Sequence, residues 1–327
     1  MIRWVSLGYL IFVAALWLVI RLGGDLWWPA TLILFGPRWI SALPLFILLP
    51  LALWKSLRSL FLLLAAALIA VGPFMGLCLP LDKAHRSDKV MLHILTCNID
   101  GNNHSKPALS FLIQASRADI VALQECPKDI RLILPPGWQM FQDGELSVLS
   151  RYPLKPGNSA QALHLPHKWP RTSLLKCTVQ MPEGDVSFCT VHLPSPRYGL
   201  QTILDRHSVI SLSRKRLLEE ETTHRRQTSM ELSCMCATLP QPVIIAGDFN
   251  MPIDSTIYRK FWGGYSDAFL QAGAGFGWTV FESVRWIKIG ARIDHVLTGK
   301  GLGVINCHTG PDIGSDHLPL IADVVRL

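Results

Sequence analysis

The sequence predicts an α/β domain that follows an apolar, helical N-terminal region. Two observations support this prediction. The first 81 residues contain long uncharged apolar segments separated by a few charged residues. From residue 91 onward, short apolar runs of strand length alternate with segments of helical periodicity, and several of these runs end on a polar residue. The 327 residues therefore divide into an apolar region at 1–81, a polar linker at 82–90 and one domain at 91–327.

Three uncharged segments, at residues 4–20, 39–54 and 59–81, predict membrane-spanning helices. A spanning helix needs about 20 apolar residues, with a range of roughly 17 to 25. The first and third segments meet this length, whereas the second is short. The uncharged stretch 26–37 either lengthens the second segment or forms a re-entrant or interfacial piece. The tryptophans near the segment ends fit interfacial belts, and they are Trp17, Trp27, Trp28, Trp39 and Trp54.

We interpret region 1–81 as a transmembrane anchor of about three helices. A cleaved signal peptide fits poorly, because no small-residue cleavage site follows the first segment and two more apolar segments come after it. Three crossings place the N-terminus and the domain on opposite sides of the membrane. The positive-inside rule then puts Arg3, Lys55 and Arg58 in the cytoplasm and the domain outside it, although the basic residues of the linker favour the reverse.

Polar residues lie at the ends of several strand-like runs in the domain. The runs include 93–98, 119–124, 187–191 and 242–246, and similar apolar stretches adjoin residues 294 and 315–317. Because binding sites are built where strands end, these side chains are candidates for one site. Buried carboxylates are costly unless they are paired or bind a cation, which points to a hard divalent metal and a phosphate as shared ligands. The candidates are Asn98, Glu125, His192, Asp248, Asn250, Asp294, Asp316 and His317.

Six fragments in this order resemble the endonuclease/exonuclease/phosphatase family, which includes deoxyribonuclease I, AP endonucleases, tyrosyl-DNA phosphodiesterases and bacterial sphingomyelinases. The fragments are ThrCysAsnIleAspGly, LeuGlnGlu, ThrValHisLeu, GlyAspPheAsn, ArgIleAspHis and SerAspHisLeuPro. The resemblance covers roughly residues 91–327 and implies a four-layer α/β sandwich of two mixed β-sheets flanked by helices. ProSerProArg after His192 and GlyPheGlyTrpThr at 275–279 resemble a membrane-anchored bacterial branch. That branch implies a location in the bacterial inner membrane.

The resemblance also implies a metal site. Glu125 would be the main ligand of Mg²⁺, or of Mn²⁺, and Asn98 and Asp316 would complete or orient the inner shell. Oxygen ligands of this kind suit magnesium or manganese rather than zinc. The sequence by itself leaves open which metal is used in the cell.

The remaining matched residues take catalytic roles by the same resemblance. Asp248 would orient or deprotonate the attacking water, and Asn250 would hold a phosphate oxygen. His317, paired with Asp294, would act as a base or as a donor to a phosphate oxygen. His192 would donate to the scissile phosphate or the leaving group, and the family often gives this histidine an acidic or aromatic partner. The sequence does not identify that partner.

Several of these residues also have structural interpretations. GlyAspPheAsn at 247–250 could be an ordinary turn, since Gly, Asp and Asn dominate turns. Asp294 could pair with Arg292 or Arg285 instead of a histidine. His295 should point to the opposite face of its strand and be structural, because side chains alternate along a strand. Arg197 could bind a phosphate or a headgroup, or could form a surface ion pair.

Two helical regions are expected around the strands. Residues 107–116 have helical periodicity with Ser105 as a cap, and a long charged stretch follows at about 200–239. Its mixed charges favour a solvated helix face, with a nucleic-acid or anionic-lipid contact as the alternative. The net charge of +7 suits polyanionic partners, but part of it flanks the membrane segments.

The eight cysteines show neither a CxxC metal pattern nor a dense disulfide framework. Cys177 and Cys189 are expected opposite each other in a hairpin around the turn at 182–185. A reduced pair in the core is the favoured state, and a disulfide is conceivable if this face is outside the cytoplasm.

The combined prediction is a membrane-anchored, divalent-metal-dependent phosphodiesterase, most simply of endonuclease or exonuclease type. The first alternative is a lipid phosphodiesterase of sphingomyelinase type, because the anchor holds the site at a bilayer. The second is a non-catalytic membrane-tethered binding module. The substrate is therefore a phosphodiester of nucleic acid or phospholipid, and the sequence implies a bilayer but no protein partner.

Overall fold

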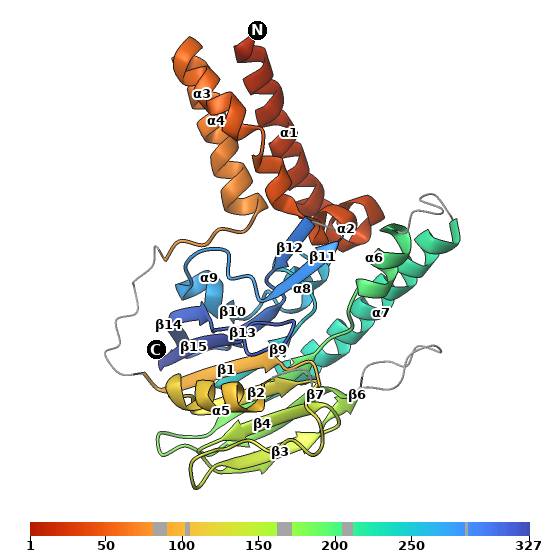
Figure 1. The fold of residues 1–327 in the computed structure, drawn as a ribbon. Helices are drawn as coiled ribbons and strands as arrows, with labels where there is room; N and C mark the ends of the chain where they lie inside the picture. The colour runs from red at the N-terminus through yellow and green to blue at the C-terminus, as the bar shows by residue number, and fades with distance from the viewer. Residues whose placement is uncertain (81–89, 102–104, 162–171, 205–211, 285–286) are drawn as a thin grey trace.

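A computed structural model describes residues 1–80, 90–101, 105–161, 172–204, 212–284 and 287–327. Its larger part is a sandwich in which two β-sheets lie face to face with helices on their outer surfaces (Figure 1). A bundle of N-terminal helices projects from one end of this sandwich. The predicted four-layer α/β sandwich, preceded by an apolar helical region, is thus confirmed. Nearly all of the predicted linker at 82–90 lies outside the described residues.

The first sheet carries the strands that begin and end the domain. Across the sheet the order is β14 (Leu302–Thr309), β15 (Leu320–Arg326), β1 (Leu92–Asn98), β2 (Ile120–Gln124), β4 (Leu146–Ser150) and β3 (Gln139–Asp143). Strands β1 and β2 are parallel, whereas β1 and β15 are antiparallel, so the sheet is mixed. Asn98 ends β1 and lies opposite Gln124, the last residue of β2. Glu125 therefore follows at the same edge.

The second sheet is also mixed. Its order is β10 (Ser266–Asp267), β13 (Asp294–Thr298), β9 (Val243–Asp248), β8 (Val186–His192), β7 (Thr172–Val179) and β5 (Leu154–Pro156), and β6 (Ala160–Gln161) pairs with β7. Strands β8 and β9 are parallel and end together, with His192 opposite Asp248. A separate antiparallel hairpin consists of β11 (Val280–Val284) and β12 (Ile287–Ala291).

Three hydrophobic clusters separate the four layers. The cluster between the sheets includes Ile94, Phe188 and Ile244, all fully buried. On the outer face of the first sheet, Leu95 packs in a cluster with side chains of α5 (Lys106–Ala115). On the outer face of the second sheet, Ile245 packs in a cluster with residues of two further helices. The remaining helices of the domain are α6 (Arg197–Leu204), α7 (Leu212–Ala237), α8 (Thr256–Phe261) and α9 (Ala268–Ala272).

These helices agree closely with the sequence expectations. Helix α5 begins after Ser105, whose hydroxyl accepts a hydrogen bond from the Ala108 amide at 3.4 Å, as expected of an N-cap. The predicted charged stretch contains α7 and most of α6. The basic run at 224–226 differs from the expected solvated helix face, because His224 and Arg225 are buried.

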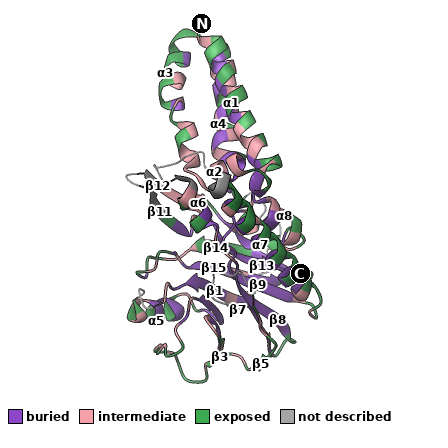
Figure 2. Ribbon diagram, turned by 90° about the vertical axis from the view of Figure 1, so that its right-hand side faces the viewer, coloured by how far each residue is buried: buried purple, intermediate pink, exposed green. Residues whose placement is uncertain are grey.

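The anchor has three helical segments that are long and apolar enough to cross a membrane: Ile2–Leu22, Arg38–Lys55 and Leu57–Phe74. They comprise α1 (Ile2–Leu22), η2 (Arg38–Ala42), α3 (Leu45–Lys55), α4 (Leu57–Ile69) and η3 (Ala70–Phe74). Large apolar side chains such as Phe46 and Phe61 are exposed on this bundle. Exposed residues occur along much of its length (Figure 2). Lipid would cover such a surface, whereas water would make it unfavourable.

Two expected boundaries in the anchor need correction. The third segment was predicted to run to residue 81, but its helix ends at Phe74, and Cys78 instead forms a β-bridge with Gly275 of the domain. The stretch 26–37 does not lengthen the second segment. It forms a separate helix, α2 (Trp28–Phe35), preceded by η1 (Gly24–Leu26), and extended backbone at Gly36 ends it. Helix α2 lies where the bundle meets the sandwich (Figure 1).

Buried ion pairs connect the anchor to the domain. Asp25 accepts a hydrogen bond from Arg225 of α7 at 3.1 Å, and both side chains are at most 1% exposed. Ser255 also donates to Asp25, and Arg38 pairs with Asp254. The Arg225 guanidinium lies over the ring of Phe35, 5.3 Å from its centroid. The N-terminal region therefore forms a packed interface with the sandwich.

The cysteine expectation was wrong in register. In the β7–β8 hairpin Cys177 lies opposite Phe188, and Cys189 lies opposite Lys176. Because neighbouring positions on a strand face opposite ways, Cys177 packs between the sheets and Cys189 packs on the helix side. Both cysteines are free thiols, and burial raises the pKa of Cys177 to about 12.

Candidate active site

The predicted site residues converge where the parallel strands of both sheets end. Asn98 and Glu125 come from the first sheet, and His192 and Asp248 come from the second. The two pairs meet directly, because the Asn98 amide lies 3.3 Å from Glu125 Oε1 and 3.2 Å from Asp248 Oδ2. Asp294 begins β13 beside Asp248 in the antiparallel β9–β13 pair. Five strands of two sheets thus build one cluster.

Unusual backbone conformations position two of these side chains. Glu125 has φ of 52° and Asn250 has φ of 51°, in the left-handed region that non-glycine residues rarely adopt. Such conformations cost about 1–3 kcal/mol each and persist where the surroundings impose them. Gly247 is required for a different reason, since a Cβ atom there would lie 2.1 Å from the Val191 carbonyl oxygen on β8. The 247–250 motif is therefore more than an ordinary turn.

Asp248 is the centre of the cluster. It is fully buried, and its carboxylate accepts hydrogen bonds from the Asn250 backbone amide at 2.8 Å and from the Asn250 side chain at 3.1 Å. The Nε2 atoms of His192 and His317 lie 3.6 and 3.9 Å from Asp248 Oδ2. Burial, assisted by the nearby Asp294 carboxylate, raises the pKa of Asp248 above its ordinary value. Keeping Asp248 ionised in the folded protein therefore lowers the stability of the fold.

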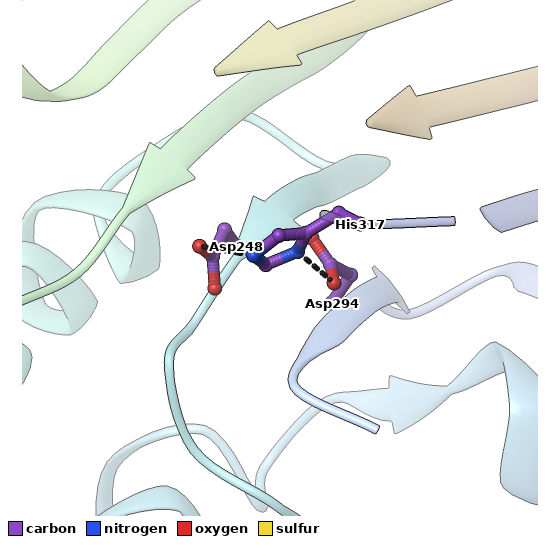
Figure 3. A group of neighbouring side chains, drawn as sticks. All are labelled: Asp248, Asp294 and His317. Carbon is purple, nitrogen blue, oxygen red and sulfur yellow. Dashed lines mark hydrogen bonds and ion pairs between the residues drawn. The ribbon is translucent and has the colours of Figure 1, made fainter. Parts of the chain in front are cut away.

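Asp294 and His317 form the predicted pair. His317 Nδ1 lies 2.8 Å from Asp294 Oδ2, and both side chains are buried (Figure 3). Although burial opposes it, the charges of Asp294 and Asp248 raise the pKa of His317 to about 10. The imidazole is therefore protonated at neutral pH, which favours the donor role over the base role. Arg292 does not pair with Asp294 but contacts the Phe276 carbonyl, and Arg285 lies outside the described residues.

His192 has the acidic partner that the sequence did not identify. Its Nδ1 lies 2.8 Å from Glu145 Oε1, and Glu145 stands directly before β4 in the first sheet. Burial lowers the pKa of His192, but Glu145 and Asp248 outweigh this effect, so the pKa is raised. The only local signal for Glu145 is its position after AspGly at 143–144, a dipeptide typical of hairpin turns. Its pairing with His192 depends on contact between the sheets.

The residues present fit a divalent cation. Glu125 and Asp316 keep 32% and 42% of their side chains exposed at the mouth of the cluster. Burial raises the pKa of Asp316, and the Asp100 and Glu125 carboxylates raise it further. A cation among these carboxylates would relieve that repulsion. The Asn98 amide donates to Glu125 and Asp248, so it is placed to orient these carboxylates.

A second group, Asp248, Asp294 and His317, could also hold an ion by its spacing, and Asp294 Oδ1 has no hydrogen-bond partner. His317 would have to lose its proton to ligate an ion there, because metal binding requires a neutral imidazole. The family resemblance instead predicts the metal at Glu125. His295 faces away, as expected, and bonds Asp267 at 2.7 Å and the Met251 carbonyl at 2.9 Å. Arg197 lies 3.9 Å from Asp316.

We expect Asp294→Asn to move the alkaline loss of activity to lower pH. A donor role for His317 requires the imidazolium, which loses its proton as pH rises towards about 10. Removing the neighbouring negative charge lowers that pKa, so the loss begins earlier. Profiles of kcat/KM against pH for both proteins measure the shift. Asp323→Asn is the matched control, because Asp323 pairs with His93 at 2.7 Å away from the site. Superimposable profiles for wild type and Asp294→Asn would remove Asp294 from the mechanism.

Comparisons with known proteins place this geometry in context. Residues 95–317 match the Endonuclease/Exonuclease/phosphatase family. A comparison with curated proteins gives no match. Among solved structures, an endonuclease/exonuclease/phosphatase family protein from Leptotrichia buccalis C-1013-b is similar, with a TM-score of 0.52 and 15% identity, over 72% of this chain and 99% of that chain.

Two further solved structures share the fold. The D. rerio protein TDP2, complexed with single strand DNA product, aligns with a TM-score of 0.50 and 16% identity over 72% of this chain and 98% of that chain. The human Nocturnin catalytic domain, with bound sulfate anion, aligns with a TM-score of 0.50 and 17% identity over 72% of this chain and 93% of that chain. At these identities the likeness concerns the fold alone.

Proposed function

The chain belongs to the endonuclease/exonuclease/phosphatase family, and on that premise we propose that it is a divalent-metal-dependent phosphodiesterase anchored in a membrane. The observation that carries the proposal is the meeting of Asn98 and Glu125 from one sheet with His192 and Asp248 from the other. Members of the family hydrolyse phosphoesters and generally use a divalent metal. Burying these acid and imidazole groups together costs free energy, and no structural role that would explain this cost is evident.

Glu125 and Asp316 would hold the metal, preferably Mg²⁺ or Mn²⁺, with Asn98 orienting the carboxylates. A bound divalent cation supplies positive charge that offsets the charge of the phosphate in the transition state. The raised pKa of the Asp248 carboxylate makes it a better proton acceptor than an ordinary aspartate. It is therefore the base that takes a proton from the attacking water.

The imidazoles of His192 and His317 act as hydrogen-bond donors in the reaction. Their Nε2 atoms flank Asp248 Oδ2. The carboxylates around them raise the pKa of both imidazoles, and at about 10 the pKa of His317 keeps that imidazole protonated at neutral pH. Each can donate to a phosphate oxygen or to the leaving oxygen. Water adds to phosphorus, one ester P–O bond breaks, and the leaving oxygen receives a proton, so a phosphodiester yields a phosphomonoester and an alcohol. Asn250 donates to Asp248 and to the Leu193 carbonyl, which makes it a positioning residue in this arrangement.

We expect Glu125→Gln to raise the Mg²⁺ concentration needed for half-maximal hydrolysis by about tenfold to hundredfold, because the variant loses a charged oxygen ligand. The measurement is the rate of bis(p-nitrophenyl) phosphate hydrolysis by full-length protein in detergent, titrated with Mg²⁺ after treatment with EDTA. Glu183→Gln, at an exposed turn, is the matched control. An identical Mg²⁺ dependence in Glu125→Gln would remove Glu125 from the metal site. No turnover at any Mg²⁺ concentration would favour the non-catalytic binding module, whereas turnover that does not depend on Mg²⁺ would contradict the metal dependence.

Nucleic acid is the substrate class that the sequence favours, through the resemblance of its ThrCysAsnIleAspGly fragment to DNA-end-processing proteins. The fold shared with the D. rerio protein in complex with a DNA product is compatible with this substrate. The buried Arg225 and His224 weaken it, because they remove two basic groups from the surface of α7. The pocket beside the site supports a phospholipid instead.

We expect the catalytic domain to lie outside the cytoplasm. The N-terminus and the α3–α4 junction lie at the end of the bundle away from the sandwich, so Arg3, Lys55 and Arg58 share one side (Figure 2). Cys234 is exposed on α7 and the other cysteines are buried, so a membrane-impermeant maleimide should label it in intact spheroplasts. A cysteine replacing Ser56, in a Cys234→Ser background, should be labelled only after permeabilisation. The reverse pattern would indicate a cytoplasmic domain.

A further inference from the structure

An apolar pocket of about 170 Å³ opens beside the catalytic cluster. Its polar lining includes Asn250, Asp316 and His317. Its apolar lining comes from three separate elements, with Phe35 of α2, Leu200 of α6 and Ile289 of β12. The pocket therefore joins the reacting groups to a surface that suits hydrocarbon.

The anchor supplies part of this pocket. Phe35 is the last residue of α2, which connects the membrane-spanning helix α1 to the second spanning segment. The β11–β12 hairpin, which carries Ile289, lies next to α2 at the base of the bundle (Figure 1). Leu26 and Trp27, just before α2, are 66% and 53% exposed, as expected of side chains that enter the membrane interface. The apolar lining of the pocket thus includes a residue from the segment that connects two of the spanning helices.

The lining does not suit a nucleic acid. Single strands bind through basic grooves that follow the backbone and through aromatic platforms on which bases stack. Among the residues that line this pocket, Arg197 and the protonated His317 supply positive charge, and Arg197 already lies 3.9 Å from Asp316. Phe35 is the aromatic lining residue, and the Arg225 guanidinium lies over its ring. An apolar tail beside a phosphate is the ligand that matches both the polar and the apolar lining.

We propose that the substrate is a phospholipid of the bilayer, whose acyl chain occupies this pocket while its phosphodiester reaches Asp248 and His317. This inference rests on the proposed function and names the substrate class of the same site. The anchor then has two roles, since it holds the domain at the bilayer and Phe35 forms a wall of the substrate pocket. Water attacks the phosphodiester as described above, and the two products are a phosphomonoester and an alcohol, one of which remains in the membrane.

The test compares four substrates with full-length protein reconstituted in phosphatidylcholine and phosphatidylglycerol vesicles with Mg²⁺. They are a dioleoyl phospholipid, its dihexanoyl homologue, bis(p-nitrophenyl) phosphate and single-stranded DNA. We expect Leu200→Asn to lower kcat/KM for the dioleoyl lipid about tenfold more than for bis(p-nitrophenyl) phosphate, because it removes apolar contact from the chain. Leu270→Asn on α9 is the matched control, since Leu270 is 49% exposed and does not line the pocket. It should leave the ratio of the two rates as in wild type.

A second measurement does not depend on activity or on the variant folding. A phospholipid with a photoreactive group at the end of its acyl chain should label peptides that contain residues 197–204 and 287–293, in addition to the spanning helices. No label in these two peptides would overturn the proposal. An equal loss of kcat/KM for the dioleoyl lipid and for bis(p-nitrophenyl) phosphate in Leu200→Asn would also overturn it. Cleavage of DNA and bis(p-nitrophenyl) phosphate without lipid hydrolysis would overturn it as well. In that last case the proposed phosphodiesterase would stand. Failure to hydrolyse any of the four substrates would overturn both.

Discussion

Asp248→Asn is expected to lower kcat for phosphodiester hydrolysis about a thousandfold, because a general base contributes roughly 10² to 10⁴ in rate. The same variant should unfold at a temperature equal to or above that of wild type. Burial and the Asp294 carboxylate raise the pKa of Asp248, so its ionised form is disfavoured in the folded protein. A neutral amide of the same shape removes this penalty. Loss of activity with unchanged or greater stability would mark Asp248 as a functional residue.

Asp267 provides the matched control, because it is a buried aspartate with the opposite shift. Burial raises its pKa, but the hydrogen bond from His295 and the nearby Arg292 outweigh this and hold the pKa well below its usual value. A lowered folded pKa contributes stability above the unfolded pKa, near 3.8, that is lost as pH falls. Asp267→Asn should therefore destabilise the fold at neutral pH by about 2 kcal/mol. The measurements are thermal unfolding and kcat of both variants in one detergent. An unfolding temperature of Asp248→Asn below that of wild type would contradict the expected result.

Asp25→Ala is expected to lower the free energy of unfolding by about 3–5 kcal/mol, because it leaves the Arg225 guanidinium buried without its carboxylate. The side chains of this pair are at most 1% exposed, and Ser255 bonds the same carboxylate. Arg225 also lies 3.4 Å from the Asn250 carbonyl, so the variant should reduce activity as well. Chemical unfolding of the full-length protein in detergent measures the first effect, and hydrolysis of bis(p-nitrophenyl) phosphate measures the second.

Two further variants test the assignment of this effect to the ion pair. The double variant Asp25→Asn with Arg225→Met should recover much of the loss, since it removes both buried charges. Glu219→Ala breaks the exposed pair with Lys215, 3.8 Å away, and should cost about 0.3–0.5 kcal/mol. A cost of Asp25→Ala as small as that of Glu219→Ala would show that the anchor contributes little to the stability of the sandwich.

Much of the fold and the site could be predicted from sequence because the signals are local. The strand ending at Asn98, the strand before Asp248 and the helix capped by Ser105 are set by apolar runs followed by a polar or capping residue. The lengths of the uncharged segments likewise predict three spanning helices. The acidic, amide and imidazole side chains at the strand ends can be identified from the sequence without knowing the topology.

The tertiary structure decided which of these groups meet. Glu145 and His192 belong to different sheets, and their contact depends on how the sheets face each other. Cys177 and Cys189 were misplaced because a register error of one residue turns a side chain to the opposite face. Arg225 contacts α2 and pairs with Asp25 instead of facing solvent. The charge pattern along a helix cannot show such a contact. The sequence by itself determined the acids, amides and imidazoles of the site and the membrane anchor, because these depend on neighbours along the chain. Their partners, and the pocket between anchor and site, depend on contacts between distant segments.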